Sequence, residues 1–395
     1  MTDAGGRALT IVVAPDSFGG ALDSVGVTAA IAAGWSDARP QDAVVRKPMA
    51  DGGEGTLAAV ADALRDAAER RTTATTDALG RAIDAEWLVL DGGRGAFVEM
   101  AAASGLARLA PGERTPANAR LASTRGTGDL ILAALDAGVE RVTIGLGGSA
   151  TTDGGSGMLR ALGVRFLDAD GGAVPEGGAS LAGLARIDAG GLDGRLNDVN
   201  LVVASDVTNT LCGPRGAAAT YGPQKGADPA AVEELDAALA AYGRSIEATT
   251  GRLVADLPGS GVAGGTTAGL LGFTAAVVRP GVEVVAELVG LAGALEAADL
   301  VITGEGRADE QTLHGKTAIG VATLAGPRRT PVVLLCGGLG PGAETLDVAT
   351  ALTVVQPIVD RPMDLPTAMA ETERLLVAAA RRLARSVGIG LSVSS

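Results

Sequence analysis

The chain is poor in aromatic residues, cysteine and lysine, and each shortage excludes a class of protein. Aromatic residues make up only 2% of the 395 positions, so the core must be built from Ala, Val and Leu. Single-stranded nucleic acid usually binds to aromatic stacking platforms, and the net charge of −14 also disfavours nucleic acid and anionic membranes as partners. We therefore expect a globular protein with neither kind of partner.

Two cysteines, Cys212 and Cys336, are too few for a disulfide framework, which suits a reducing compartment. No apolar run reaches the roughly 18 residues of a membrane-spanning helix, and residues 1–7 do not resemble a secretory leader. The single histidine, His314, and the two distant cysteines cannot form the usual zinc ligand sets. These features predict a cytoplasmic protein.

Lysine occurs only three times, at Lys47, Lys225 and Lys316, against 29 arginines. Each lysine lies beside a loop rich in glycine or proline. Because an ammonium group is a compact charge well suited to phosphate, these positions are candidates for anion binding.

The pattern of apolar runs predicts an α/β fold with two domains, as expected for a chain of this length. Both ends of the chain carry short β-branched runs typical of buried parallel strands, at residues 9–14, 43–49, 300–303, 332–335 and 351–355. We expect these ends, residues 1–75 and 285–395, to form one doubly wound, flavodoxin-like parallel sheet. Residues 76–284 would form an inserted second α/β domain. Flavodoxin-like order places the strand at 300 beside the strand at 9, with the switch point between them.

Two polar segments leave these switch-point strands, where ligands of open α/β sheets bind. One is Asp16-Ser17, and the other is the long segment 304–317. A helix predicted from about Lys316 offers free N–H groups and a positive dipole end to phosphate. The segment is not a Walker A loop, because Glu310 occupies the position of its first glycine.

A glycine-rich pattern recurs at 51–55, 91–95 and 153–157. Alternating strands flank the middle copy, which is predicted to be only a hairpin turn. The first and third copies precede predicted helices, where anions bind. Segment 145–150 also fits the dinucleotide fingerprint, with Asp168 about 20 residues further on. An NAD(P)-dependent dehydrogenase of a small hydroxy acid is therefore an alternative, although residues 151–155 separate these glycines from the helix.

A series of ordered motifs resembles the bacterial glycerate kinase family over nearly the whole chain. The motifs are Ala14-Pro15-Asp16-Ser17-Phe18, Pro48-Met49-Ala50-Asp51-Gly52-Gly53-Glu54-Gly55-Thr56, Gly145-Leu146-Gly147-Gly148-Ser149-Ala150-Thr151-Thr152-Asp153-Gly154-Gly155, Ala204-Ser205-Asp206-Val207-Thr208-Asn209, Cys212-Gly213-Pro214-Arg215-Gly216-Ala217, Gly222-Pro223-Gln224-Lys225-Gly226-Ala227, Ile302-Thr303-Gly304-Glu305-Gly306-Arg307 and Gln311-Thr312-Leu313-His314-Gly315-Lys316. The resemblance implies phosphorylation of D-glycerate by ATP and Mg²⁺, commonly to 2-phosphoglycerate, on a two-domain α/β fold with a cleft between the domains. The sequence leaves a homo-oligomer open.

Motif membership and charge type then assign hypothetical roles. Asp206 would orient or deprotonate the glycerate hydroxyl, and Asn209 and Lys316 complete the catalytic candidates. Substrate-binding candidates are Asp16, Ser17, Arg125, Arg215 and Arg307. The candidates for binding ATP phosphates are Asp51, Gly52, Gly53, Gly147, Gly148, Ser149 and Lys225. Glu305 and Asp309, together with Asp16, are the candidate Mg²⁺ ligands.

One position departs from the family pattern. Many members resemble Asp-Ser-Phe-Lys-Gly at the first motif, whereas this chain has Gly19 at the lysine position. If that lysine binds an anion elsewhere in the family, another cation must replace it here, and Arg125 is the candidate.

Overall fold

The computed structural model describes residues 7–314, 317–346 and 351–394. The chain divides into two compact units. Unit 1 comprises the N-terminal part up to Asp51, residues 58–65, and the C-terminal part from Val282, and unit 2 comprises residues 52–57 and 66–281. The boundaries expected from the sequence were 75/76 and 284/285. Residues 69–75 fall in unit 2 because strand β3 (Glu69–Thr76) pairs with β4 (Ala82–Leu90) along its whole length.

The sheet of unit 1 is parallel and has five strands in the order β13-β12-β11-β1-β2. This is the flavodoxin-like order, and the predicted pairing of the first strand with the strand at 300 is confirmed by the register Ile11↔Leu300. Asp16, which follows β1, and Gly304, which lies in β11, therefore belong to neighbouring strands. The strands are β1 (Thr10–Val13), β2 (Ala43–Arg46), β11 (Leu300–Ala308), β12 (Val332–Leu339) and β13 (Val354–Pro357).

Strand β11 continues five residues beyond its predicted end at 303 and pairs with β12 as far as Ala308↔Leu339. Residues 304–308, which the sequence suggested were loop, are therefore strand. Glycine allows this close pairing, because a Cβ added at Gly337 would lie 2.4 Å from the carbonyl oxygen of Gly306. The polar segment consequently begins at Asp309.

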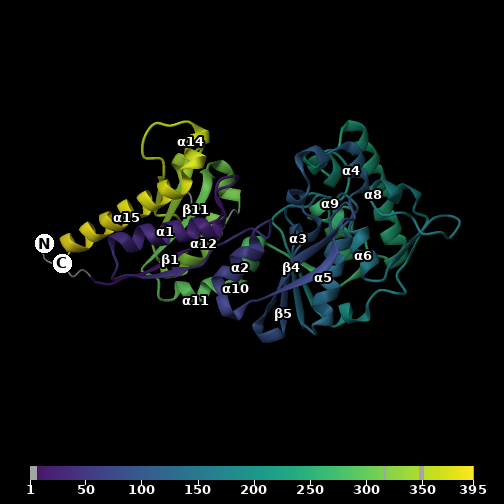
Figure 1. Cartoon of the computed structure of the whole chain (residues 1–395), viewed down its shortest axis with the longest axis horizontal. Coiled ribbons are helices and arrows are strands. Elements are labelled where there is room, and N and C mark those ends of the chain that lie inside the picture. The colour runs from purple at the N-terminus through teal and green to yellow at the C-terminus, as the bar shows by residue number, and fades with distance from the viewer. Residues whose placement is uncertain (1–6, 315–316, 347–350, 395) are drawn as a thin grey trace. The chain divides into compact units, whose positions relative to one another are not determined.

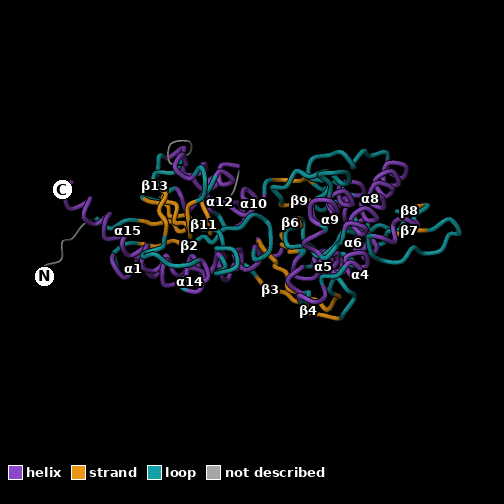
Figure 2. The backbone as a smooth tube through the Cα atoms, turned by 90° about the horizontal axis from the view of Figure 1, so that it is seen from above, coloured by secondary structure: helices purple, strands orange, loops and turns teal. Residues whose placement is uncertain are grey.

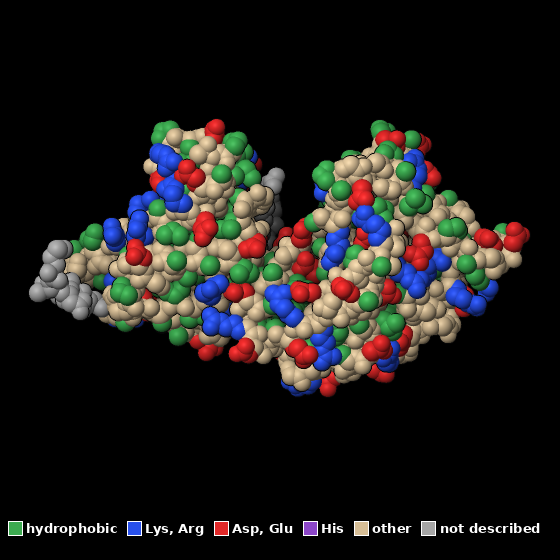
Figure 3. Space-filling model, viewed as in Figure 1, with side chains coloured by type: hydrophobic (Ala, Val, Ile, Leu, Met, Phe, Trp, Pro, Cys, Tyr) green, Lys and Arg blue, Asp and Glu red, His purple; other side chains and the backbone are tan. Residues whose placement is uncertain are grey.

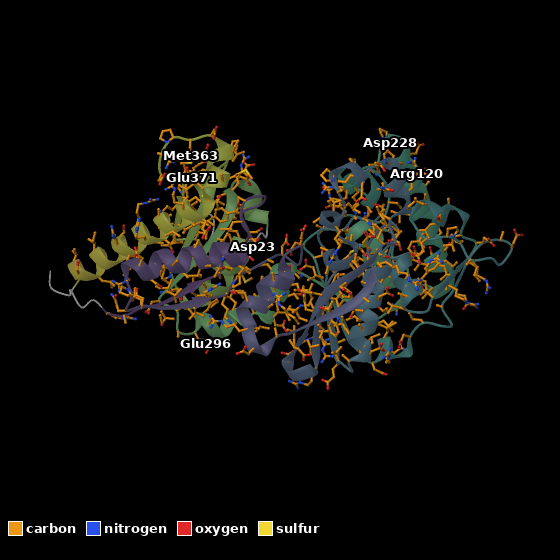
Figure 4. The ribbon with its side chains drawn as sticks, viewed as in Figure 1. Asp23, Arg120, Asp228, Glu296, Met363 and Glu371 are labelled. Carbon is orange, nitrogen blue, oxygen red and sulfur yellow. The ribbon has the colours of Figure 1, made fainter. Side chains whose placement is uncertain are left out.

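Helices from the two ends of the chain pack side by side in unit 1. In Figure 1, α1 (Ser24–Ala38) lies along α15 (Thr372–Ser394). Their backbones approach closely at Gly34, where an added Cβ would lie 2.2 Å from the carbonyl oxygen of Val377. Asp23, labelled in Figure 4, caps α1 by accepting a hydrogen bond from the N–H of Gly26.

The remaining helices of unit 1 include two that were predicted as one. Residues 283–297 form α10 (Gly281–Leu288) and α11 (Leu291–Leu295), because Gly290 adopts φ +67° between them. Lys47 donates from Nζ to the carbonyl oxygen of Val289 at 2.5 Å, so this lysine caps the end of α10. The others are α2 (Thr56–Leu64), whose first two residues belong to unit 2, α12 (Thr317–Ala325) and α14 (Leu365–Ala370).

The sheet of unit 2 has six strands in the order β10-β9-β6-β5-β4-β3. Strands β5 (Gly95–Glu99), β6 (Arg141–Gly145), β9 (Asn200–Ala204) and β10 (Val277–Arg279) are parallel, whereas β3 and β4 are antiparallel. Figure 2 draws these strands in orange. The carboxyl ends of the four parallel strands share one edge, and the loops that leave this edge carry most of the candidate residues of unit 2.

The middle glycine-rich copy, 91–95, lies at the antiparallel junction of β4 and β5, as predicted for a hairpin. The long helix α8 (Pro229–Thr250) begins after Asp228, which accepts a hydrogen bond from the N–H of Ala231. Strands β7 (Arg165–Leu167) and β8 (Arg186–Asp188) form a separate antiparallel pair. The other helices are α3 (Ala101–Ser104), α4 (Pro116–Leu121), α5 (Arg125–Asp136), α6 (Ser156–Ala161), α7 (Ala217–Tyr221) and α9 (Val262–Phe273).

The two cores consist mainly of Ala, Val, Leu and Ile, as the low aromatic content required. The few large aromatic side chains are concentrated inside, with Trp35 buried in unit 1 and Phe97, Phe166 and Tyr242 buried in unit 2. On the face shown in Figure 3, basic and acidic side chains are interspersed over each unit. Within the described residues, no helix combines the length and apolar character needed to cross a membrane.

Candidate active site

Two of the glycine-rich segments meet at the carboxyl edge of the unit 2 sheet. The N–H of Gly147, just after β6, donates to the carbonyl oxygen of Gly52 at 3.3 Å. A Cβ added at Gly147 would lie 2.3 Å from the Cα of Gly53, so only glycine permits this approach. The structure thus brings together the candidates Gly52, Gly53, Gly147 and Gly148.

The 147–153 loop is held on its other side by the segment after α3. The N–H of Leu106 donates to the oxygen of Gly148 at 2.7 Å, and the N–H of Ala150 donates to the oxygen of Ser104 at 2.9 Å. Gly148 is exposed and adopts φ +72°. The N–H groups of Gly148 and Ser149 have no hydrogen-bond acceptor among the described residues. Unpaired backbone N–H groups in a fixed turn suit a bound anion.

Lys225 lies beneath this loop and is only 3% exposed. Its Nζ donates to Ser149 Oγ at 2.9 Å and to the carbonyl oxygen of Thr151 at 2.6 Å. Burial lowers the pKa of Lys225 to about 7, and the nearby Asp153 opposes the shift. Lys225 is a candidate for binding ATP phosphates, and in this structure its hydrogen bonds hold the loop itself.

Asp153, also fully buried, joins the loop to two helix N-termini. Its carboxylate accepts hydrogen bonds from the N–H and Oγ1 of Thr124 before α5, and from the N–H groups of Gly155 and Gly157 around the start of α6. Burial raises the pKa of Asp153, while these four donors stabilise its charged form. Asp153 therefore fixes the end of the 147–153 loop.

Glu99 was not predicted as a site residue. It ends β5, is 6% exposed, and accepts hydrogen bonds from the N–H groups of Gly55 at 3.0 Å and Leu57 at 2.7 Å. Burial raises the pKa of Glu99, and the two backbone donors oppose the shift. The carboxylate anchors the end of the 51–55 segment at the start of α2. The sequence signal that could have identified Glu99 was its position as the one acidic residue at the end of an otherwise apolar strand.

A second unrecognised element is the glycine-rich start of α9. Ala263, Gly264 and Gly265 have positive φ values, and the N–H of Gly154 donates to the oxygen of Gly264 at 2.9 Å. A Cβ added at Gly264 would lie 2.0 Å from the oxygen of Thr151. This segment packs against the 147–153 loop, and the four glycines within residues 259–265 were its sequence signal.

Asp206 and Asn209 follow β9 at the same edge of the unit 2 sheet. Asp206 is exposed, and its Oδ1 accepts a hydrogen bond from the N–H of Gly281 at 2.9 Å. Asn209 Nδ2 donates to the carbonyl oxygen of Arg215 at 2.7 Å, and Tyr221 donates to Asn209 Oδ1 at 3.0 Å. Asn209 thus organises the turn that carries Arg215.

The arginine candidates differ in their pairing. Arg215 is exposed and has no ion pair or side-chain hydrogen bond with any described residue. Arg125, at the start of α5, pairs with Glu176 at 3.2 Å, and Arg307 in unit 1 pairs with Asp309 at 3.2 Å. Arg215 therefore has the guanidinium most available to an anionic substrate.

In unit 1, Asp16 follows β1 and lies at the start of α12. Its Oδ2 accepts a hydrogen bond from Thr317 Oγ1 at 2.6 Å, and its Oδ1 accepts one from the N–H of Ser17 at 2.6 Å. Burial raises the pKa of Asp16 and the nearby Asp51 adds to the rise, whereas the hydrogen bonds oppose it. The structure therefore brings Asp16, Ser17 and Asp51 together.

Glu305 and Asp309 are linked through Thr312. Thr312 Oγ1 donates to Glu305 Oε1 at 2.8 Å and accepts from the N–H of Asp309 at 3.1 Å. Lys316, the third catalytic candidate, lies outside the described residues. The described part of the chain contains no group of three or more His, Cys, Asp or Glu side chains arranged to hold a metal ion.

Comparisons with known proteins identify the family of the chain. Residues 11–388 match the model of the glycerate kinase family. The chain belongs to the glycerate kinase family. A glycerate kinase from Halalkalibacterium halodurans is 44% identical over 375 residues, which cover 95% of this chain and 97% of the relative. A glycerate 2-kinase from Escherichia coli is 44% identical over 331 residues, covering 84% of this chain and 86% of the relative.

A solved structure extends the glycerate kinase comparison to the fold. A crystal structure from Salmonella typhimurium LT2 that carries the assignment glycerate kinase 2 has a TM-score of 0.84 and 42% sequence identity. The match covers 97% of this chain and 99% of that chain. The mixed α/β architecture is therefore that of the glycerate kinase family.

The dehydrogenase alternative fails on geometry as well as on family membership. The fingerprint needs a helix directly after the glycines and an acid at the end of an adjacent parallel strand. Here α6 begins only at Ser156 and ends at Ala161. Asp168 follows β7, which pairs with β8 outside the main sheet, and its Oδ1 accepts hydrogen bonds from the N–H groups of Asp170 and Gly172 within its own turn.

The acids of unit 1 fit the requirements of Mg²⁺, which is usually held by one or two carboxylates together with substrate phosphates. Burial raises the pKa of Asp16, and repulsion from the nearby Asp51 carboxylate adds to the rise. A divalent cation would relieve this repulsion. The donor set is therefore compatible with the ion that phosphoryl transfer needs.

Gly19, at the position where the family pattern described above has lysine, leaves space for a side chain. It is exposed, its φ is not in the left-handed region, and no described atom lies within 4 Å of an added Cβ. We therefore expect Gly19→Lys to change the free energy of unfolding by no more than about 0.5 kcal/mol. If a cation at this position binds substrate, Gly19→Lys should lower the KM for D-glycerate at least about threefold, because it adds charge-assisted contacts.

Gly19→Gln is the matched control, since it adds a side chain without charge. Steady-state kinetics at varied D-glycerate should show no change in KM for Gly19→Gln. Equal KM values for the lysine and glutamine variants would exclude a role for charge at this position.

Proposed function

We propose that this protein transfers the γ-phosphoryl group of ATP to the 2-hydroxyl group of D-glycerate, with Mg²⁺ as cofactor. The observation that carries the proposal is the 44% identity to the E. coli glycerate 2-kinase over 84% of the chain. Cytoplasmic location stays a prediction from the low cysteine content.

The 147–153 loop and the adjoining 51–55 segment would bind the phosphates of ATP. The support is geometric: the N–H groups of Gly148 and Ser149 lack acceptors among the described residues, and the loop is fixed by Gly52, Ser104 and Lys225. A rigid loop with unpaired donors is already arranged for an anion before the anion binds. Phosphoryl transfer depends mostly on such positioning and on neutralising charge.

Asp206 would orient and deprotonate the hydroxyl group of D-glycerate. In this step the hydroxyl oxygen forms a bond to the γ-phosphorus, the bond between that phosphorus and its bridging oxygen breaks, and the proton passes to the Asp206 carboxylate. The products are 2-phosphoglycerate and ADP. Asp206 is suited to the role because it is exposed at a strand end and held by Gly281.

Arg215 is the leading candidate to bind the substrate carboxylate, because its guanidinium is exposed and unpaired among the described residues. Arg307 and Arg125 remain candidates, although each already pairs with an acid. Ser17 is exposed beside Asp16 and can donate to substrate oxygens. Lys316 remains a predicted catalytic residue.

Mg²⁺ would be held in unit 1 by Asp16, with Glu305 and Asp309 as the other candidate ligands. Bound there, the ion would neutralise phosphate charge during transfer. Thr317 and Thr312 orient these carboxylates through the hydrogen bonds described above. Asp51 adds a second negative charge beside Asp16.

A coupled ADP-release assay tests this proposed function. With ATP and Mg²⁺, ADP should form only when D-glycerate is present. ATP with Mg²⁺ should also raise the Tm of the protein, because a ligand that binds only the folded state stabilises it. No ADP release with D-glycerate or related hydroxy acids, together with stabilisation by NADH, would contradict the proposal.

A further inference from the structure

We propose that Lys225 is a positioning residue of the 147–153 loop, tying Ser149 to Thr151 from inside unit 2 and taking up a proton when phosphate occupies the loop. The proposal rests on the proposed function, since it assumes that this loop binds the phosphates of ATP. It assigns to Lys225 an action through the loop in place of direct contact with the nucleotide.

The first support is the position of the ammonium group. Nζ contacts Ser149 Oγ and the oxygen of Thr151, two groups on either side of Ala150. The same turn carries the N–H groups of Gly148 and Ser149 that lack acceptors among the described residues. Lys225 therefore sets the shape of the turn that would bind the anion.

The second support is that the backbone at Lys225 is fixed. Lys225 ends a short 3₁₀ helix, Pro223–Lys225, and the N–H of Gly226 closes it on the oxygen of Pro223. Gly226 has φ +97°, and an added Cβ would lie 2.3 Å from the carbonyl carbon of Arg114. The lysine stem thus starts from a rigid point, and its buried side chain has little freedom to reach elsewhere.

The third support is incomplete charge compensation. Asp153 is the acid that acts on Lys225, but its oxygens already accept four hydrogen bonds. Arg160 and Tyr242 also interact with Asp153. Other charged residues near Lys225 in its surroundings or in the chain are Arg114, which is exposed, and Asp228, which caps α8. Burial accordingly holds the pKa of Lys225 at about 7, so much of the free protein carries a neutral amine at slightly alkaline pH.

A phosphate bound at Gly148 and Ser149 would bring negative charge close to this amine and favour its protonated form. The pKa of Lys225 is then higher in the bound state than in the free state, so binding takes up a proton. By thermodynamic linkage, the affinity for phosphate must then depend on pH. It is highest below about pH 7, the pKa of Lys225 in the free protein, and it falls as the pH rises from that value to the pKa in the bound protein.

Isothermal titration calorimetry measures this proton directly. A non-hydrolysable ATP analogue with Mg²⁺ is titrated into the whole protein at pH 8, where the phosphates of the nucleotide are already deprotonated, in two buffers of different ionisation enthalpy. Wild type should take up a measurable fraction of a proton for each nucleotide bound, because the amine is mostly neutral in the free protein at this pH. Binding without proton uptake by the wild type would overturn the proposal, whatever the variants do.

Lys225→Met, of similar length but uncharged, should bind the analogue without proton uptake. Its KM for ATP should rise at least about tenfold at pH 7 and lack the pH dependence expected of wild type between pH 7 and 9, whereas the KM for D-glycerate should change less than about threefold. Lys225→Arg keeps a charge and should retain part of the affinity. A KM with the wild-type pH dependence in Lys225→Met would refute the proposal.

If Lys225→Met does not fold, Ser149→Ala tests the contact between Lys225 and the loop in its place. It removes one loop contact but keeps the lysine, so we expect a raised KM for ATP with proton uptake preserved. Wild type that never releases ADP from ATP with D-glycerate would contradict the proposed function itself. An active wild type with no proton uptake would contradict only the role of Lys225.

Discussion

Asp206→Asn is expected to lower kcat by at least about 100-fold while leaving the fold intact, because it removes the group that accepts the hydroxyl proton. The remaining Oδ1 of asparagine can still accept the hydrogen bond from the N–H of Gly281. Steady-state ADP release at saturating ATP and D-glycerate measures the loss. The KM for ATP should change little, because Asp206 is not assigned to the nucleotide.

Asp198→Asn is the matched control for this variant. Asp198 is an exposed acid just before β9, at the opposite end of the strand that leads to Asp206. Its variant should keep wild-type turnover. Turnover of Asp206→Asn within about tenfold of wild type would show that Asp206 is not the base.

Asp153→Asn is expected to destabilise the protein by about 2–4 kcal/mol, because the buried carboxylate accepts four hydrogen bonds. An asparagine side chain must point its NH₂ group at donors from Thr124 and Gly157 or at the N–H of Gly155. Either orientation places donors against each other in a buried site. Urea unfolding followed by circular dichroism should show a lower midpoint with an unchanged slope.

Asp168→Asn provides the comparison for stability. Asp168 also accepts two backbone hydrogen bonds, but on one oxygen and in a surface turn, so its asparagine variant can keep both. We expect a loss below about 1 kcal/mol. Equal losses in the two variants would mean that the buried network around Asp153 does not fix the loop as described.

The strand order of unit 1 could be predicted because its strands are continuous β-branched runs that end at polar residues. The register Ile11↔Leu300 joins segments from opposite ends of the sequence, and the flavodoxin-like order required that pairing. The end of β11 could not be predicted in the same way. Glycines at 304 and 306 were interpreted as loop, whereas the close approach of Gly306 to Gly337 keeps them in the sheet.

The segments that form the candidate site could be predicted from the sequence, but the contacts that each side chain makes there could not. Glycine pairs at 52–53 and 147–148 indicated anion binding, yet their mutual packing depends on a contact between loops far apart in the sequence. Burial of Lys225 depends in the same way on Ser149, 76 residues away. Local sequence gave no sign that this lysine lies inside the unit or that Glu99 anchors a distant helix.

Proton-coupled ³¹P NMR of the product tests the central claim most directly. The protein is incubated with ATP, Mg²⁺ and D-glycerate, and the new phosphomonoester signal is examined. Transfer to the 2-hydroxyl predicts a doublet, because the carbon that bears the phosphate carries one proton. A triplet would place the phosphate on the 3-hydroxyl, and the absence of any new phosphomonoester would contradict glycerate kinase activity altogether.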